Sequence, residues 1–111
     1  MSIGNLIAVG LPIALGVVMI GAGVVNFVGP RSVRDSFVSW GYPAGFHRVT
    51  GGLEAIAGSL LLIPATSRAG AIGSIAILTA AVITLIRHRG LGHLPGAVAL
   101  AAVAAAVTIL G

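Results

Sequence analysis

Hydrophobic residues fill four long stretches of this chain, at about residues 5–28, 46–64, 69–86 and 94–110. Each stretch is close to the roughly 20 residues with which an α-helix crosses the hydrocarbon core of a membrane. The connections between them are short, which makes consecutive helices antiparallel neighbours. The pattern predicts an all-α protein in which residues 1–111 form a single domain, a four-transmembrane-helix antiparallel bundle.

The connection after the first stretch carries a different pattern. Val33, Phe37 and Trp40 recur at the spacing i, i+4 and i+7, while arginine, serine and aspartate occupy the other face. This spacing predicts a short amphipathic helix over about residues 30–40 that lies in the membrane interface. Trp40 and Tyr42 suit that depth because their rings are amphipathic. Two roles remain open for the segment: an interfacial anchor, or a lid over a site in the bundle.

The composition supports a membrane protein. Hydrophobic residues make up 58% of the 111 residues and charged residues 7%, and the mean hydropathy is +1.15. A soluble domain has roughly 25% charged residues. The chain contains no cysteine, which excludes disulfides, thiol redox chemistry and cysteine-ligated metals within it.

The basic residues bear on membrane topology rather than on nucleic acid, which we do not expect as a partner. All six are arginines, and only Arg68 lies at the second connection. The others lie at the first and third connections: Arg31, Arg34, Arg48, Arg87 and Arg89. The positive-inside rule therefore predicts a multi-pass protein of the cell (plasma) membrane, with connections 29–46 and 87–93 in the cytoplasm and both termini outside.

Glu54 is the only acidic side chain inside an apolar stretch. An ionisable group at membrane depth needs a partner, a proton or a water-filled cavity, so it marks a candidate functional site. His47, Gly51, Glu54 and Gly58 lie within an arc of roughly 60° around the helix and form a single stripe. Small residues on such a stripe allow a ligand or a neighbouring backbone to approach, although they are ordinarily packing surfaces. Burial favours the protonated carboxyl and a nearby cation favours the carboxylate, and the sequence leaves both open.

We take Glu54 and His47 as the candidate catalytic residues, for acid/base chemistry. The candidate ligand-binding residues are Asn26, Trp40, Tyr42, Arg48, Gly51 and Gly58. Under the predicted topology a polar vestibule leads from the cytoplasmic end to Glu54, with Arg87, His88, Arg89 and His93 at the same end. In the alternative arrangement these cations reach the interface, and Glu54 is neutral and hydrogen-bonded to a backbone carbonyl or to Asn26.

We expect no metal site, because Glu54 and His47 are seven residues apart and no third ligand is assured. A haem bound by His47 or His88 is also disfavoured, since a lone histidine near a helix end is more often an interfacial residue. No cofactor is therefore assigned, although a quinone or another lipid-soluble ligand remains open.

Several short motifs occur in a characteristic order between about residues 20 and 95. They are Trp40-Gly41-Tyr42-Pro43, Phe46, Gly51-Gly52, Glu54, Gly58, Leu61-Leu62, Pro64 and Gly70. In this order the chain resembles the DoxX-like integral membrane protein family. The resemblance implies a four-helix multi-pass fold, and the wider family includes subunits associated with thiosulfate:quinone oxidoreduction and receptor-assembly chaperones of animals. It implies no single activity, so only the fold, the Gly-Tyr-Pro turn and the Glu54 position are carried over.

Three functions remain open, and whether the protein is an enzyme is left undecided. The first is a site for a hydrophobic small molecule such as a quinone or isoprenoid, with Glu54 as proton carrier or anchor, His47 as relay, and Asn26 and Arg48 as hydrogen-bond donors. The second is a non-catalytic membrane accessory or chaperone that packs on the helices of a partner through its glycine and alanine faces. Either a homodimer or a complex with a partner membrane subunit is expected.

The third function is proton-coupled export by a small multidrug exporter. Such exporters place the glutamate in their first helix and line the site with aromatic side chains, whereas Glu54 is in the second stretch and aromatic residues make up 5% of this chain. Export is therefore disfavoured. Between the first two functions, a ligand site predicts a cavity that reaches Glu54, and a packing role predicts a closed core there.

Overall fold

A computed structural model describes residues 2–88 and 94–110, and in this part of the chain every regular element is helical. The elements are α1 (Ile3–Val28), α2 (Arg31–Ser39), α3 (Phe46–Leu62), the short 3₁₀ helix η1 (Pro64–Thr66), α4 (Ser67–Arg87) and α5 (Leu94–Leu110). The all-α prediction is confirmed. The helix bounds also lie within a few residues of the four apolar stretches and of the amphipathic segment.

Two segments are long and apolar enough to cross a membrane, judged by length and composition. They are α1, with 26 residues, and the continuous segment Pro64–Arg87, with 24 residues. The helix α5 is apolar but shorter. The 17 residues of α3 extend over about 26 Å at 1.5 Å per residue, slightly less than the hydrocarbon thickness of about 30 Å.

The ends of α1 follow from its flanking residues. At its start, the Ser2 hydroxyl accepts a hydrogen bond from the Asn5 backbone N–H at 3.1 Å, which caps the first turn. At its end, Gly29 has a φ of 66°, in the left-handed region that glycine adopts without a steric penalty. Pro30 then separates α1 from α2.

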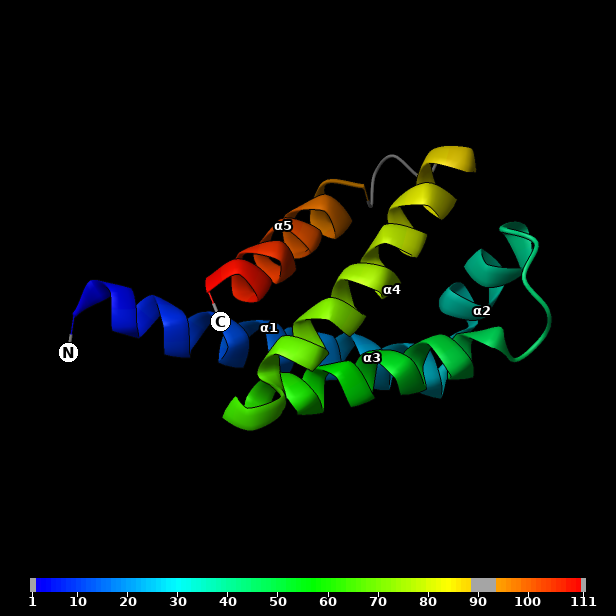
Figure 1. Cartoon of the computed structure of the whole chain (residues 1–111). Helices are drawn as coiled ribbons and strands as arrows, with labels where there is room; N and C mark the ends of the chain where they lie inside the picture. The colour runs from blue at the N-terminus through cyan, green and yellow to red at the C-terminus, as the bar shows by residue number, and fades with distance from the viewer. Residues whose placement is uncertain (1, 89–93, 111) are drawn as a thin grey trace.

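Helices α1 and α3 run antiparallel and in close contact (Figure 1). A Cβ atom added at Gly58 would lie 2.7 Å from the carbonyl oxygen of Gly16, and one added at Gly23 would lie 2.6 Å from that of Gly51. The two glycines of each helix are seven residues apart, so both contacts fall on one line of the interface. Glycine is required at these positions because the two backbones approach directly.

Helices α4 and α5 form a second pair, which leaves the α1–α3 pair at an angle (Figure 1). The start of α4 touches the end of α3, where a Cβ at Gly70 would lie 2.7 Å from the Leu61 nitrogen. The Arg68 guanidinium donates a hydrogen bond to the Thr108 carbonyl at 3.4 Å, so α5 returns antiparallel to α4. The core between the pairs consists of Leu15, Met19, Ala57, Leu61, Ala71, Leu78, Ala104 and Val107.

Candidate functional site

Phe37 is the centre of an aromatic cluster at one end of the molecule. Its buried ring lies 5.3 Å from Trp40, 5.7 Å from Tyr42, 6.3 Å from Phe46 and 6.4 Å from His47, measured between ring centroids. The apolar face of α2 therefore packs on the connection that follows it and on the first turn of α3. The polar face of α2, which carries the ion pair between Arg31 and Asp35, is exposed.

Tyr42 connects this cluster to α4. Its ring stacks on Phe46 with a centroid separation of 4.6 Å and an interplanar angle of 10°. Its hydroxyl lies 2.5 Å from the hydroxyl oxygen of Thr84. Thr84 already donates its hydroxyl proton to the Ala80 carbonyl, at 2.8 Å, so Tyr42 is the donor in this hydrogen bond. The Gly-Tyr-Pro turn thus positions a side chain that holds the end of α4 beside α2.

A buried polar group lies within the interface between α1 and α3. The Asn26 side-chain amide donates a hydrogen bond to Glu54 Oε1 at 2.5 Å. The Asn26 backbone carbonyl lies 2.8 Å from His47 Nδ1, and because a carbonyl can only accept, Nδ1 carries the proton. Glu54 and His47 are each 6% exposed. The sequence left open whether a backbone carbonyl or Asn26 is the hydrogen-bond partner of Glu54, and the structure shows the hydrogen bond to Asn26.

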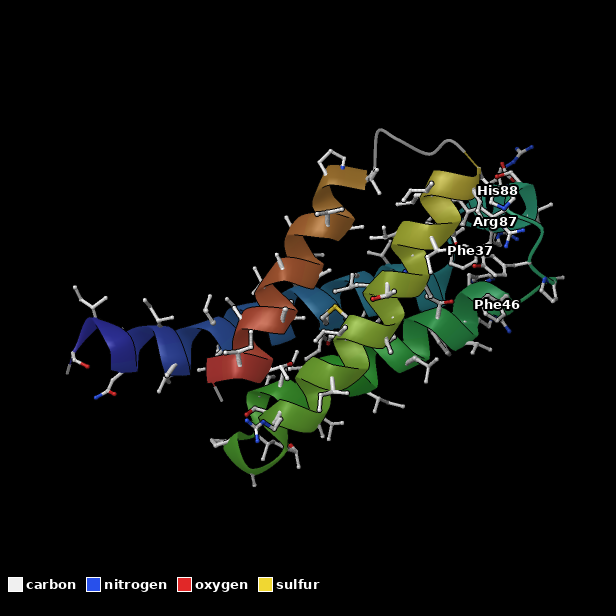
Figure 2. The ribbon with its side chains drawn as sticks, turned by 45° about the horizontal axis from the view of Figure 1, so that its top comes forward. Phe37, Phe46, Arg87 and His88 are labelled. Atoms are coloured by element: carbon white, nitrogen blue, oxygen red, sulfur yellow. The ribbon has the colours of Figure 1, made fainter. Side chains whose placement is uncertain are left out.

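Two cavities among the described residues bear on the candidate site. The larger, of about 400 Å³, lies between the end of α2 and the last turns of α4. It is lined by Trp40, Gly41, Tyr42, Ala80, Ile83, Thr84, Arg87 and His88. We call it the interfacial cavity. Figure 2 shows Arg87 and His88 at the end of α4, at the same end of the molecule as Phe37 and Phe46.

The smaller cavity, of about 160 Å³, is an apolar groove along the outer surface of α1 and α3. Its lining residues are Gly23, Val24, Phe27, Val28, Gly51, Gly52 and Ala55. Glu54 and His47 line neither of the two cavities. In the described structure, the larger cavity and the buried polar group are therefore separate sites.

The structure divides the candidate site residues into distinct environments. Trp40 and Tyr42 line the interfacial cavity, whereas Asn26, His47 and Glu54 form the buried polar group. Gly58 faces the backbone of α1, as does Gly51, which also borders the apolar groove. Arg48 is exposed on α3 and lines neither cavity. Arg89 and His93 fall outside the described residues.

The sequence placed Arg87 and His88 near the predicted vestibule, but it did not assign the α4 wall of the cavity to a binding site; this wall consists of Ala80, Ile83, Thr84, Arg87 and His88. One signal was present, because Arg87 and His88 belong to the connection that the topology places at the same end as Trp40 and Tyr42. No local signal links Tyr42 to Thr84, which is 42 residues away in the sequence.

The described residues contain no group of three or more histidine, cysteine, aspartate or glutamate side chains that could hold a metal ion. His47 uses Nδ1 to bind the Asn26 carbonyl, and the ring packs against Gly29. These contacts fix the orientation of the imidazole within the interface between α1 and α3.

Comparison with protein-family models gives a match to the DoxX-like family over residues 10–107. The chain belongs to the DoxX-like family. No curated protein and no solved structure matched it. Family membership, together with the long apolar helices, makes this DoxX-like chain a membrane protein. Both the buried polar group and the interfacial cavity lie within the matched residues.

Proposed function

We propose that this DoxX-like protein binds a hydrophobic small molecule in the interfacial cavity. The observation that carries the proposal is a space of about 400 Å³ with Trp40 and Tyr42 on one wall and Ala80 and Ile83 on the other. Small-molecule sites occupy about 300–1,000 Å³ and combine apolar walls with a few placed polar groups. A quinone, an isoprenoid or a similar lipid-soluble compound has the matching chemistry.

The proposal includes a four-span arrangement in the plasma membrane. In it α1, α3, α4 and α5 cross the bilayer, α2 lies in the interface, and the α2 end faces the cytoplasm. The distribution of arginines supports this orientation, since only Arg68 belongs to the connection between α3 and α4. The interfacial cavity then opens at the level of the lipid head groups, where a lipid-soluble ligand can enter from the bilayer.

Glu54 has a structural role in this proposal. Its carboxyl is almost fully buried, is hydrogen-bonded to Asn26 and lines neither cavity. Acid/base chemistry on a ligand, or proton-coupled export, would require the carboxyl to reach the substrate. The contacts instead favour a polar link that fixes α1 against α3.

A packing role on a partner is the second candidate function. It is favoured by the first part of α1, where all residues from 3 to 10 are exposed. Figure 1 shows this part of α1 extending beyond the other helices. Ile3 and Leu6, which are 76% and 55% exposed, would pack on a partner subunit or on a second copy of the chain.

Tryptophan fluorescence tests the ligand proposal, because Trp40 is the only tryptophan of the chain and lines the cavity. We expect a short-chain quinone to quench Trp40 saturably in the purified protein. The substitution Ala80→Leu places bulk in the cavity and should weaken binding about tenfold or more, equivalent to about 1.4 kcal/mol. Ala76→Leu is the matched control, since Ala76 is exposed one turn earlier on α4 and does not line the cavity.

The same titration separates the alternatives. Glu54→Gln should bind the quinone as the unmodified protein does. A loss of binding in this variant would show that Glu54 contributes to the ligand site. Quenching that never saturates, and that Ala80→Leu leaves unchanged, would reject the cavity and leave the packing role as the better candidate.

A further inference from the structure

The interfacial cavity changes in polarity along α4. Ala80, Ile83, Thr84, Arg87 and His88 share one face of the helix and extend over roughly 12 Å of its axis. The inner part of this wall is formed by Ala80 and Ile83, which are apolar. The outer part is formed by the exposed side chains of Arg87 and His88. A ligand that fits this wall has an apolar body and a polar end.

The charge of that polar end follows from the acidic residues of the chain. Asp35 and Glu54 are the only two. Asp35 pairs with Arg31, with an Nε to Oδ2 distance of 3.9 Å, and Glu54 is buried with Asn26. The charge of Arg87 is therefore not matched by a carboxylate side chain of this chain.

The position and shape of the Arg87 guanidinium favour particular anionic head groups. Arg87 lies in the last turn of α4, where a positive charge also stabilises the helix through its dipole. The interaction with the helix dipole uses only the charge of Arg87, so the five N–H donors of its guanidinium can bind a ligand. Their planar arrangement matches the two oxygens of a carboxylate or phosphate, and the ring of His88 offers a further N–H donor.

We propose that the interfacial cavity binds an amphiphile with an anionic head group, a carboxylate or a phosphate, which Arg87 and His88 hold at the outer end. The apolar chain of the amphiphile lies between the Trp40–Tyr42 wall and the Ala80–Ile83 wall. This inference rests on the proposed function, since it names the ligand class of the same cavity. The ligand is either a free amphiphilic acid or an anionic phospholipid of the bilayer.

Quenching of Trp40 by brominated lipids tests the inference. The protein is placed in nanodiscs of phosphatidylcholine and titrated with dibromostearate and, separately, with its uncharged methyl ester. We expect the acid to quench Trp40 at about tenfold lower concentration than the ester, the effect of one charge-assisted hydrogen-bonded contact. Nanodiscs with brominated phosphatidylglycerol or brominated phosphatidylcholine form the second arm, and stronger quenching by phosphatidylglycerol identifies a phospholipid as the source of the head group.

Variants separate a specific contact from general attraction to a cationic surface. Arg87→Gln should remove the preference for the acid over the ester, and saturable quenching by the ester in this variant shows that the cavity is folded. Arg34→Gln is the matched control, because Arg34 is exposed on α2 and does not line the cavity. If Arg87→Gln and Arg34→Gln lost the preference for the acid over the ester to the same extent, the inference would be overturned.

Two further outcomes count against the anionic head group. Equal quenching by the acid and the ester, unchanged in Arg87→Gln, would overturn the inference while leaving the proposed hydrophobic site in place. Competition by acetate as strong as that by the long-chain acid would show that the apolar chain contributes nothing. Absence of saturable quenching by every probe would reject both the inference and the proposed function.

Discussion

Asn26 joins two helices through two different groups, and the sequence around it explains why both are available. In a continuing helix, the Asn26 carbonyl would accept the N–H of the residue four positions later. That residue is Pro30, which has no N–H, so the carbonyl would lack a partner. His47 Nδ1 supplies the missing donor. Close packing of His47 on Gly29 brings the ring within reach.

At the same scale, the hydrogen bond between Asn26 and Glu54 should contribute to stability as a coupled pair. Asn26→Leu leaves the Glu54 carboxyl buried without its donor, which should lower the free energy of unfolding by about 1–3 kcal/mol. Glu54→Met in addition should recover part of that loss, because no unpaired polar side chain then remains. Denaturant unfolding in detergent of the two single variants and the double variant measures the coupling energy. Additive losses would show that the pair is not coupled.

At the scale of the elements, the interface between α1 and α3 distinguishes two adjacent glycines. A Cβ at Gly51 would collide with the backbone of Gly23 and Phe27, whereas a Cβ at Gly52 would meet nothing within 4 Å. The two residues have the same helix propensity and differ only in the face that they occupy. A substitution at Gly51 therefore tests the contact between α1 and α3, whereas a substitution at Gly52 tests the helix propensity of α3 alone.

Gly51→Ala should destabilise the protein by about 1–3 kcal/mol, because α1 must move to accommodate the methyl group. Gly52→Ala should be neutral or stabilising by up to about 1 kcal/mol, since alanine is the better helix former. Thermal unfolding in detergent, followed by circular dichroism, compares the two variants. Equal stability of Gly51→Ala and Gly52→Ala would mean that the α1–α3 contact is looser than described.

The helix α2 shows how far an amphipathic pattern determines an element. The spacing of Val33, Phe37 and Trp40 predicted the helix, and α2 occupies Arg31–Ser39. The pattern also predicted which face is apolar. It did not predict that Phe37 packs on His47 and Phe46 of α3, because an apolar face on an interfacial helix can cover lipid as well as protein.

At the scale of the whole molecule, α2 lies at the end of the molecule where α3 begins and α4 ends (Figure 1), and the aromatic cluster around Phe37 belongs to this end. The interfacial cavity lies at this end, between the last turns of α4 and the α2 connection. The cations of α2, the start of α3 and the end of α4 belong to the same end. The same arrangement of helices therefore places the interfacial cavity and these cationic side chains at one end of the molecule.

The proposed orientation of the whole molecule can be tested directly, because the chain contains no cysteine. In intact cells, a membrane-impermeant maleimide should label Ala65→Cys in η1, between α3 and α4. It should label Ser39→Cys at the end of α2 only after the membrane is permeabilised. Both positions are exposed, so access to the reagent depends on the side of the membrane. The reverse labelling pattern would place the α2 end outside the cell.

The sequence by itself determined the helices of this protein, the apolar face of α2 and the stripe of His47, Gly51, Glu54 and Gly58. Periodicity carries that information because each helix fixes the angular positions of its own side chains. Only the tertiary structure decided that α1 covers this stripe, that Asn26 is the partner of Glu54, and that Tyr42 meets Thr84. The physical reason is that a face of small or apolar residues fits a ligand, a lipid or another helix equally well, and the choice depends on contacts between residues far apart in the chain.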